Sequence, residues 1–464
     1  MAAQAFDIEQ LVTDLRALAD DRVSTGASQR EHHSHGESWH ASALPDVVVF
    51  PETTDEVAAV VRTAAKHRAP IVPFGAGSSL EGHVHALHGG VSLDLTRMNR
   101  ILRVSADDLD CTVEAGVTRR QLSKHLNPLG LEFWVDPGAD ATIGGMASTR
   151  ASGTTAVRYG TMREVVLGLT VVLADGRVVH TGSRARKSSS GYDLTRLFVG
   201  AEGTLGVITE VTLRLFGLPD GISAAVCPFP TFEGAVRTVI TILQIGIPIA
   251  RMELLDEKML RAINAYAKTD YALQPTLFLE FHGISDEAVA EQARAVEGIA
   301  REQGASSFAW ATTPEARTAL WTARHNVHHA AVASRPGCRM WSTDVCVPIS
   351  RLAECLMETK ADLAALPFPW PIVGHVGDGN FHVLCVVNPD DPEELGIAQA
   401  MNERLVARAL RLGGTCSGEH GVGHGKMGYM RQEHGEALDV MRTIKLALDP
   451  QNLMNPGKMV NTEE

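Results

Sequence analysis

The chain has 464 residues, of which 45% are hydrophobic and 21% charged, as is typical of a globular protein with two or three domains. Its formal net charge of −13 argues against a nucleic-acid partner, because binding a phosphate backbone requires a basic face. The seven cysteines include no Cys-x-x-Cys pair. This argues against a disulfide framework, a zinc ribbon or a Cys-ligated cluster, and favours buried thiols in a reducing compartment.

The N-terminal residues predict an amphipathic helix that begins at Asp7, and they do not resemble a signal peptide. Nowhere do 18 apolar residues follow one another, so no transmembrane segment is expected. We therefore expect a cytoplasmic protein and leave peripheral membrane contact open. The His- and Glu-rich stretch 31–40 lacks a glycine scaffold. We interpret it as a solvated polar loop in preference to a second metal site.

Residues 46–115 predict short strands that alternate with helices. Two capping boxes, Thr53 to Glu56 and Thr118 to Gln121, predict helix starts. The Asp175-Gly176 pair within 165–180 predicts a β-hairpin, and a further strand is expected at 207–216.

From about residue 225 the pattern changes to strand, long helix, strand, which predicts a second α/β layer whose sheet is covered on one side. Gly and Pro residues place the boundary near 218–224.

Three glycine-rich segments are suited to contacts between backbone and a ligand. The first follows a predicted strand, and its backbone N–H groups and hydroxyls are expected to hold a pyrophosphate. It matches neither the P-loop nor the Rossmann fingerprint, and a plain strand-to-turn loop is the alternative. Its predicted binding residues are Pro73, Gly75, Ala76, Gly77, Ser78, Ser79 and Gly82.

The second segment, 136–153, is small and hydroxyl-rich, so a flat ring system could lie against its main chain. In the third, 202–208, backbone amides could bind an adenine or a ring edge. The predicted binding residues of these two segments are Pro137, Gly138, Thr142, Gly144, Gly145, Ser148, Ser152, Gly153, Glu202, Gly206 and Ile208.

In this order, PFGAGSSLEG, DPGADATIGGMASTRASGTTAVRYG and GAEGTLGVIT resemble the FAD-binding domain of the vanillyl-alcohol oxidase and p-cresol methylhydroxylase superfamily. The resemblance implies FAD bound between two α+β subdomains without a Rossmann fold. No His or Cys lies inside PFGAGSSLEG to tether the flavin, so non-covalent FAD is implied, although His83 lies just beyond.

A histidine and carboxylate cluster is the clearest chemical signal. His375 and His382 flank a Gly-Asp-Gly-Asn turn between two predicted strands, which would bring both imidazoles to one end of a sheet. With Glu419 they predict a divalent metal site (Zn or Mn) that has open positions. Such a site suits a substrate that presents a hydroxyl and a carboxylate. His420 is then the expected general base.

Arg324 is the expected clamp for the substrate carboxylate. Residues 320–328 read as one helix on which Arg324 and His328 are stacked at i and i+4. A solvated surface arginine is the alternative.

These motifs, with STDVCVP at 342–348 and LMNPGK at 453–458, resemble the C-terminal domain of the FAD-linked oxidases. The resemblance is greatest to the FAD- and metal-dependent D-lactate dehydrogenases, and smaller to the D-2-hydroxyglutarate dehydrogenases and the catalytic glycolate oxidase subunit. It implies His375, His382 and Glu419 as metal ligands, His420 as base and Arg324 as substrate arginine. It also implies a monocarboxylate substrate, because Ser342 stands where the hydroxyglutarate enzymes carry a lysine.

The resemblance further implies an α+β fold with a discontinuous FAD-binding domain. That domain is expected at 1–220, completed by about 440–464 with Asn455 at the cofactor, and residues 221–439 form a cap domain with an antiparallel sheet. The expected activity is oxidation of a D-2-hydroxy acid by FAD, with a quinone, a carrier protein or oxygen as electron acceptor. A homodimer is left open. A metal-dependent hydrolase and a non-catalytic flavoprotein subunit are the competing interpretations.

Overall fold

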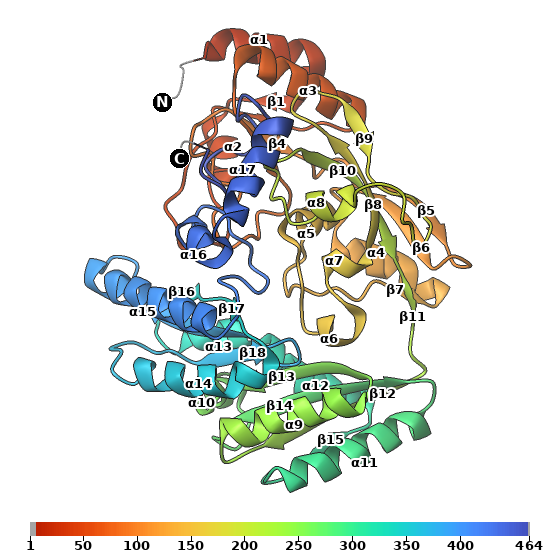
Figure 1. Ribbon diagram of the computed structural model, residues 1–464, viewed down its shortest axis with the longest axis vertical. Helices are drawn as coiled ribbons and strands as arrows, with labels where there is room; N and C mark the ends of the chain where they lie inside the picture. Colours follow the sequence, from red (N-terminus) through yellow and green to blue (C-terminus); the bar gives the residue numbers. More distant parts are fainter. Residues whose placement is uncertain (1–5, 463–464) are drawn as a thin grey trace. The chain divides into compact units, whose positions relative to one another are not determined.

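The computed structural model describes residues 6–462, which divide into two compact units (Figure 1). Unit 1 is drawn from Met1–Ser152, Gly160–Leu218 and Glu419–Glu464, and unit 2 from Gly153–Tyr159 and Pro219–Gly418. The boundary at Leu218 falls within the predicted stretch. The chain returns to unit 1 at Glu419, about twenty residues earlier than expected, and the seven residues Gly153–Tyr159 belong to unit 2.

The N-terminal part of unit 1 is a four-stranded sheet in the order β1-β2-β4-β3, in which β2, β4 and β3 run parallel. Helices α1 and α3 lie side by side (Figure 1), and their apolar faces form one core with β2, β3 and β4. The elements are α1 (Ile8–Ala19), β1 (Val23–Ser24), α2 (Ala27–His32), β2 (Val47–Val49), α3 (Thr54–His67), β3 (Ile71–Phe74) and β4 (Val91–Asp94).

Both predicted capping positions start helices, but neither is a complete capping box. Thr53 and Thr118 each accept the backbone N–H three residues on, as predicted. The side chain of Glu56 binds Arg22, and that of Gln121 donates to the carbonyl of Asn99. Asp7 caps α1, so the expected N-terminal helix is confirmed.

The second part of unit 1 is a five-stranded antiparallel sheet in the order β5-β6-β10-β8-β9, and the predicted hairpin at 165–180 joins β8 to β9. Its strands and short helices enclose a separate core. Strands β7 and β11 form a separate antiparallel pair. The remaining elements of unit 1 are β5 (Ile101–Ser105), β6 (Asp110–Glu114), α4 (Arg119–Leu126), β7 (Leu131–Glu132), α5 (Ile143–Thr149), α7 (Met162–Val165), β8 (Val166–Val172), β9 (Val178–His180), α8 (Leu194–Phe198), β10 (Val207–Arg214), β11 (Phe216–Gly217), α16 (Met430–His434) and α17 (Ala437–Leu448).

Unit 2 is built on an antiparallel sheet in the order β15-β12-β14-β13-β18-β19-β16, with β17 also paired to β19. Its elements are α6 (Ala156–Tyr159), β12 (Gly221–Pro228), α9 (Phe232–Ile245), β13 (Ile249–Leu255), α10 (Glu257–Ala267), β14 (Thr276–Gly283), α11 (Asp286–Glu302), β15 (Ala309–Ala311), α12 (Pro314–His325), α13 (Val327–Ala333), β16 (Arg339–Ser342), β17 (Val345–Cys346), α14 (Ile349–Leu363), β18 (Ile372–His375), β19 (Asn380–Val387) and α15 (Pro392–Arg411).

The prediction that this sheet is covered on one side is wrong. Successive side chains of a strand point to opposite faces, yet Leu277, Phe278 and Leu279 of β14 are all fully buried. Helices α10, α12 and α13 cover the face that carries Phe278, and α11 packs against β12 and β14. Both layers of helices come from the same alternating segment, so the sequence pattern could not separate them.

Among residues 6–462, no helix has the length and apolarity needed to cross a membrane. None of the seven cysteines forms a disulfide, and five of them are buried, while Cys338 and Cys346 are partly exposed. The prediction of buried thiols therefore holds for five of the seven.

Candidate functional site

A cavity in unit 1 is lined by all three glycine-rich segments. Its space, part of which is continuous with solvent, is about 1190 Å³. The described residues that line the cavity include no lysine or arginine, so an anionic ligand there would be held by backbone N–H groups and hydroxyls.

Almost every predicted cofactor-binding residue lines this cavity. The exceptions are Gly82, which packs against His424, Gly138, whose surroundings are open, and Gly153, which belongs to unit 2. The predicted residues that line it are Pro73, Gly75, Ala76, Gly77, Ser78, Ser79, Pro137, Thr142, Gly144, Gly145, Ser148, Ser152, Glu202, Gly206, Ile208 and Asn455.

Two of these glycines are required because the chain packs closely at both positions. A Cβ atom at Gly75 would lie 2.3 Å from Thr142 Oγ1, and one at Gly144 would lie 2.5 Å from Ala115 Cβ. A larger residue at Gly75 would push the first segment away from the second, and one at Gly144 would push the second segment away from Ala115.

Two buried polar atoms at the cavity are unsatisfied in their hydrogen bonding. Ser79 Oγ and His83 Nδ1 have no hydrogen-bond partner among the described residues, and the His83 side chain is 5% exposed. Buried polar atoms are nearly always hydrogen-bonded, so these two point to a bound ligand.

The sequence did not predict the apolar wall of the cavity at Val84, Leu95 and Met146, because in the sequence such residues cannot be distinguished from residues of the hydrophobic core.

The loop that carries Glu419 and His420 is anchored to unit 1 by a buried carboxylate. Glu202 accepts the backbone N–H groups of Val422 at 2.7 Å and Gly423 at 2.8 Å, and lies 3.3 Å from His83 Nε2. Burial alone would raise the pKa of Glu202, but His83 and the two N–H groups outweigh it and hold the pKa below its usual value. This anchoring explains why the chain rejoins unit 1 at Glu419. The prediction for Glu202 concerned its backbone amide, whereas its side chain holds this loop.

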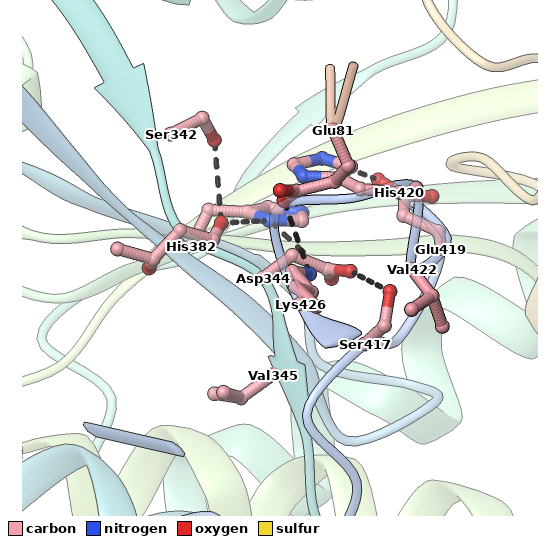
Figure 2. Close-up of polar contacts among 12 residues, drawn as sticks. Glu81, Ser342, Asp344, Val345, His382, Ser417, Glu419, His420, Val422 and Lys426 are labelled. Carbon is pink, nitrogen blue, oxygen red and sulfur yellow. Dashed lines mark hydrogen bonds and ion pairs between the residues drawn. The ribbon is translucent and has the colours of Figure 1, made fainter. Parts of the chain in front are cut away.

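A second buried carboxylate, Glu81, lies beneath the same loop. Lys426 Nζ is 3.3 Å from Glu81 Oε1 (Figure 2), and His40 Nε2 is 3.6 Å from Oε2. A Cβ at Gly423 would lie 1.9 Å from the carbonyl oxygen of Glu81, so this position must be glycine. Burial alone would raise the pKa of Glu81, but Lys426 and His40 outweigh this effect and hold the pKa below its usual value. The carboxylate is therefore ionised.

The interpretation of residues 31–40 as a solvated loop is wrong for two of its histidines. His33 is buried, and its Nε2 lies 2.8 Å from Asp94 Oδ2. His40 packs against His424, with 4.3 Å between ring centroids. Sequence spacing could not show this, because Asp94 and His424 lie far along the chain.

In unit 2, one face of the sheet changes from apolar to charged. Its apolar end, with Leu255, Phe278 and Val373, packs under α10, α12 and α13. Neighbouring positions on the same face, set by the strand register, carry Arg251, Glu253, Glu280, His282, His375 and His382.

The two predicted metal-binding histidines meet on this face as expected. The β18–β19 turn leaves their ring centroids 5.5 Å apart. His375 Nδ1 donates to Glu253 Oε1 at 2.7 Å, and His382 Nδ1 donates to the carbonyl of Thr343 at 2.9 Å. Because a carbonyl and an ionised carboxylate only accept, each ring keeps its lone pair on Nε2, the arrangement that a metal-binding histidine needs.

Arg324 is not a solvated surface arginine. Its Nε and Nη2 donate to Glu253 Oε2 at 3.0 and 2.5 Å, and its side chain is 11% exposed. The single helix expected over 320–328 is wrong, because α12 ends at His325 and α13 starts at Val327. Arg324 and His328 therefore do not share a helix.

The Asp344 carboxylate is hydrogen-bonded to strand β19, which carries His382. Its carboxylate accepts from Asn380 Nδ2 at 2.8 Å and from Ser417 Oγ at 2.9 Å (Figure 2), and it lies 3.8 Å from His382 Nδ1. The carboxylate thus ties β19 to the chain that leads into Glu419.

Comparison with known proteins supports these observations. Residues 218–459 match the C-terminal domain of the FAD-linked oxidases, and residues 45–182 match an FAD binding domain. The chain belongs to the FAD-linked oxidase family. Its cofactor is FAD, and it is an oxidoreductase.

Relatives within the FAD-linked oxidases match along the whole chain. A probable mitochondrial D-lactate dehydrogenase of Danio rerio is 51% identical over 100% of this chain and 95% of its own length. A mitochondrial D-lactate dehydrogenase (cytochrome) of Arabidopsis thaliana is 44% identical over 97% of this chain and 80% of its own.

The solved structure of p-cresol methylhydroxylase, at 19% identity, superposes with a TM-score of 0.81 over 98% of this chain and 97% of its own. The expected α+β fold with antiparallel sheets is confirmed.

Proposed function

We propose that this protein oxidises a D-2-hydroxy acid, D-lactate above all, to the 2-keto acid. The observation that carries the proposal is the charged end of the unit 2 sheet. There two imidazoles each donate Nδ1 to an oxygen acceptor, and Arg324 donates to the same buried carboxylate as His375. The relatives named D-lactate dehydrogenase support this substrate class. D-2-hydroxyglutarate and glycolate are the alternative substrates.

We propose His375, His382 and Glu419 as the ligands of a divalent metal, Zn or Mn. The donor set fits, because both histidines commit Nδ1 to oxygen acceptors and so present Nε2. A metal held there would polarise the substrate hydroxyl and lower its pKa. We assign FAD to unit 1, which also contains Glu419 and His420, and we assign His375, His382 and Arg324 to unit 2, the cap domain.

The remaining proposed roles fall to a base and a clamp. His420 removes the hydroxyl proton of the substrate, and Arg324 orients its carboxylate through the guanidinium edge that Glu253 does not occupy. Bound FAD supplies the two-electron acceptor for the hydride at Cα. The final acceptor is an electron carrier or a quinone, in line with the relative named a cytochrome-linked enzyme.

The substrate class is tested by anaerobic bleaching of the flavin with D-lactate, L-lactate and D-2-hydroxyglutarate. D-lactate should bleach it with the highest specificity constant, because Ser342 offers no cation for a second substrate carboxylate. A second substrate carboxylate would then be buried without a cation. The D preference rests on the relatives.

A variant with a positive charge at position 342 tests the same substrate preference in the opposite direction. Ser342 pairs with Leu384, two residues beyond His382 on β19. Ser342→Lys should raise the preference for D-2-hydroxyglutarate over D-lactate by about tenfold or more, as a newly satisfied buried charge allows. A wild-type enzyme that already prefers D-2-hydroxyglutarate would show that another cation serves the second carboxylate.

We predict that FAD is held without a covalent bond, since PFGAGSSLEG contains no residue that could tether it. Acid precipitation should release the yellow flavin into the supernatant, where its absorbance is measured. If colour stays with the pellet, His83 is the residue to test, because it lines the cavity and its Nδ1 has no partner among the described residues. His83→Asn should then release the flavin.

A further inference from the structure

Glu253 is hydrogen-bonded to His375 and Arg324, two residues with different roles in the proposed function. It lies within β13, is fully buried, and divides its two oxygens between them. Oε1 accepts from His375 Nδ1, while Oε2 accepts from Arg324 Nε and Nη2. The partners come from different elements, β18 and α12.

An ionised carboxylate at this position needs an explanation. The same face carries Phe278 directly opposite on β14 and Leu255 two residues further along β13, both fully buried. Burying an ionised carboxylate is unfavourable unless it is well paired, and an apolar residue would continue the core without that penalty. Packing alone therefore does not favour glutamate here.

We infer that Glu253 is a positioning residue that orients both His375 and Arg324. The inference rests on the proposed function. By accepting from Nδ1, Glu253 holds the lone pair of His375 on Nε2 and increases the basicity of the ring. By binding Nε and Nη2 of Arg324, it fixes the guanidinium plane and leaves the Nη1 edge for a substrate carboxylate. One carboxylate thus sets the geometry of metal and substrate together.

The neighbouring strand offers a matched control. Glu280 of β14 is also buried between a histidine and an arginine, 2.9 Å from His282 Nε2 and 3.5 Å from Arg251 Nε. His282 Nδ1 lies 2.7 Å from the Tyr159 hydroxyl. Both ring nitrogens of His282 are therefore engaged within unit 2. Glu280 is thus a buried carboxylate with the same kinds of partner as Glu253, but its histidine has no proposed role in metal binding.

The test is a Mn²⁺ titration of FAD-loaded protein, with free Mn²⁺ followed by electron paramagnetic resonance. Glu253→Gln should weaken Mn²⁺ binding by about 10–100-fold, the usual effect of losing the partner of a metal-binding histidine. It should also raise KM for D-lactate. Glu280→Gln should leave Mn²⁺ affinity unchanged. Equal affinity in wild type and Glu253→Gln overturns the inference.

A double variant guards against poor folding and against a charge effect. Glu253→Gln leaves the buried Arg324 without its carboxylate, and that charge could by itself repel a cation. Glu253→Gln/Arg324→Gln removes both charges. Continued weak Mn²⁺ binding supports the action on His375, whereas full recovery overturns it. Wild-type protein that binds no Mn²⁺ overturns the metal site of the proposed function itself, a result distinct from either.

Discussion

Replacing His420 with alanine should slow the reduction of the flavin by D-lactate by about 10²–10⁴-fold, the range expected when a general base is lost. The hydroxyl proton would have no positioned acceptor, so hydride transfer would be delayed, while substrate binding through Arg324 should persist. Anaerobic stopped-flow measurement of flavin absorbance at saturating D-lactate isolates this step from the later transfer to an acceptor.

His434→Ala is the control for this variant. His434 lies in the same C-terminal segment at the end of α16, is 31% exposed and is 3.6 Å from Glu433. It should reduce flavin at the wild-type rate. Because His420 adjoins Glu419, the metal content of His420→Ala must equal that of wild type before its rate is interpreted. A wild-type rate in His420→Ala would disprove the assignment of the base.

The parts of the site that depend on local sequence could be predicted. The two histidines flank a four-residue turn between β-rich runs, and antiparallel pairing then brings them to one sheet end. The glycine-rich segments were predictable because small residues concentrate where backbone segments approach one another. In both cases the signal and the contact lie within a few residues.

The residues that support the site could not be predicted, because their partners are distant in the chain. Glu253 is 122 residues from His375 and 71 from Arg324, and Glu202 is 220 residues from Val422. The one signal was an acidic residue inside an apolar strand, as in the sequence ARMELL, which alone does not identify a partner. Arg324 was correctly singled out, but its pairing with a carboxylate depends on how α12 packs on the sheet.

Removing the metal should abolish turnover and leave the fold and the flavin in place. Polarisation of a substrate oxygen by a divalent metal contributes several kcal/mol, and each 1.36 kcal/mol is a factor of ten in rate, so a loss of about 10³-fold is expected. FAD absorbance should change little, because Glu419 is the one proposed metal ligand among the described residues that line the cavity. Activity, absorbance and thermal unfolding are measured before and after chelation.

The unfolding midpoint distinguishes a catalytic metal from a structural one. The core of unit 2 is closed by Phe278, Leu320 and Trp321 under α10 and α12, and the metal-binding histidines lie at its charged margin. A chain of this size buries enough apolar surface to fold without a metal. Chelation should therefore move the midpoint little, and added Mn²⁺ or Zn²⁺ should restore the rate. Unfolding on chelation would assign the metal a structural role, and full activity in metal-free protein would remove it from the reaction.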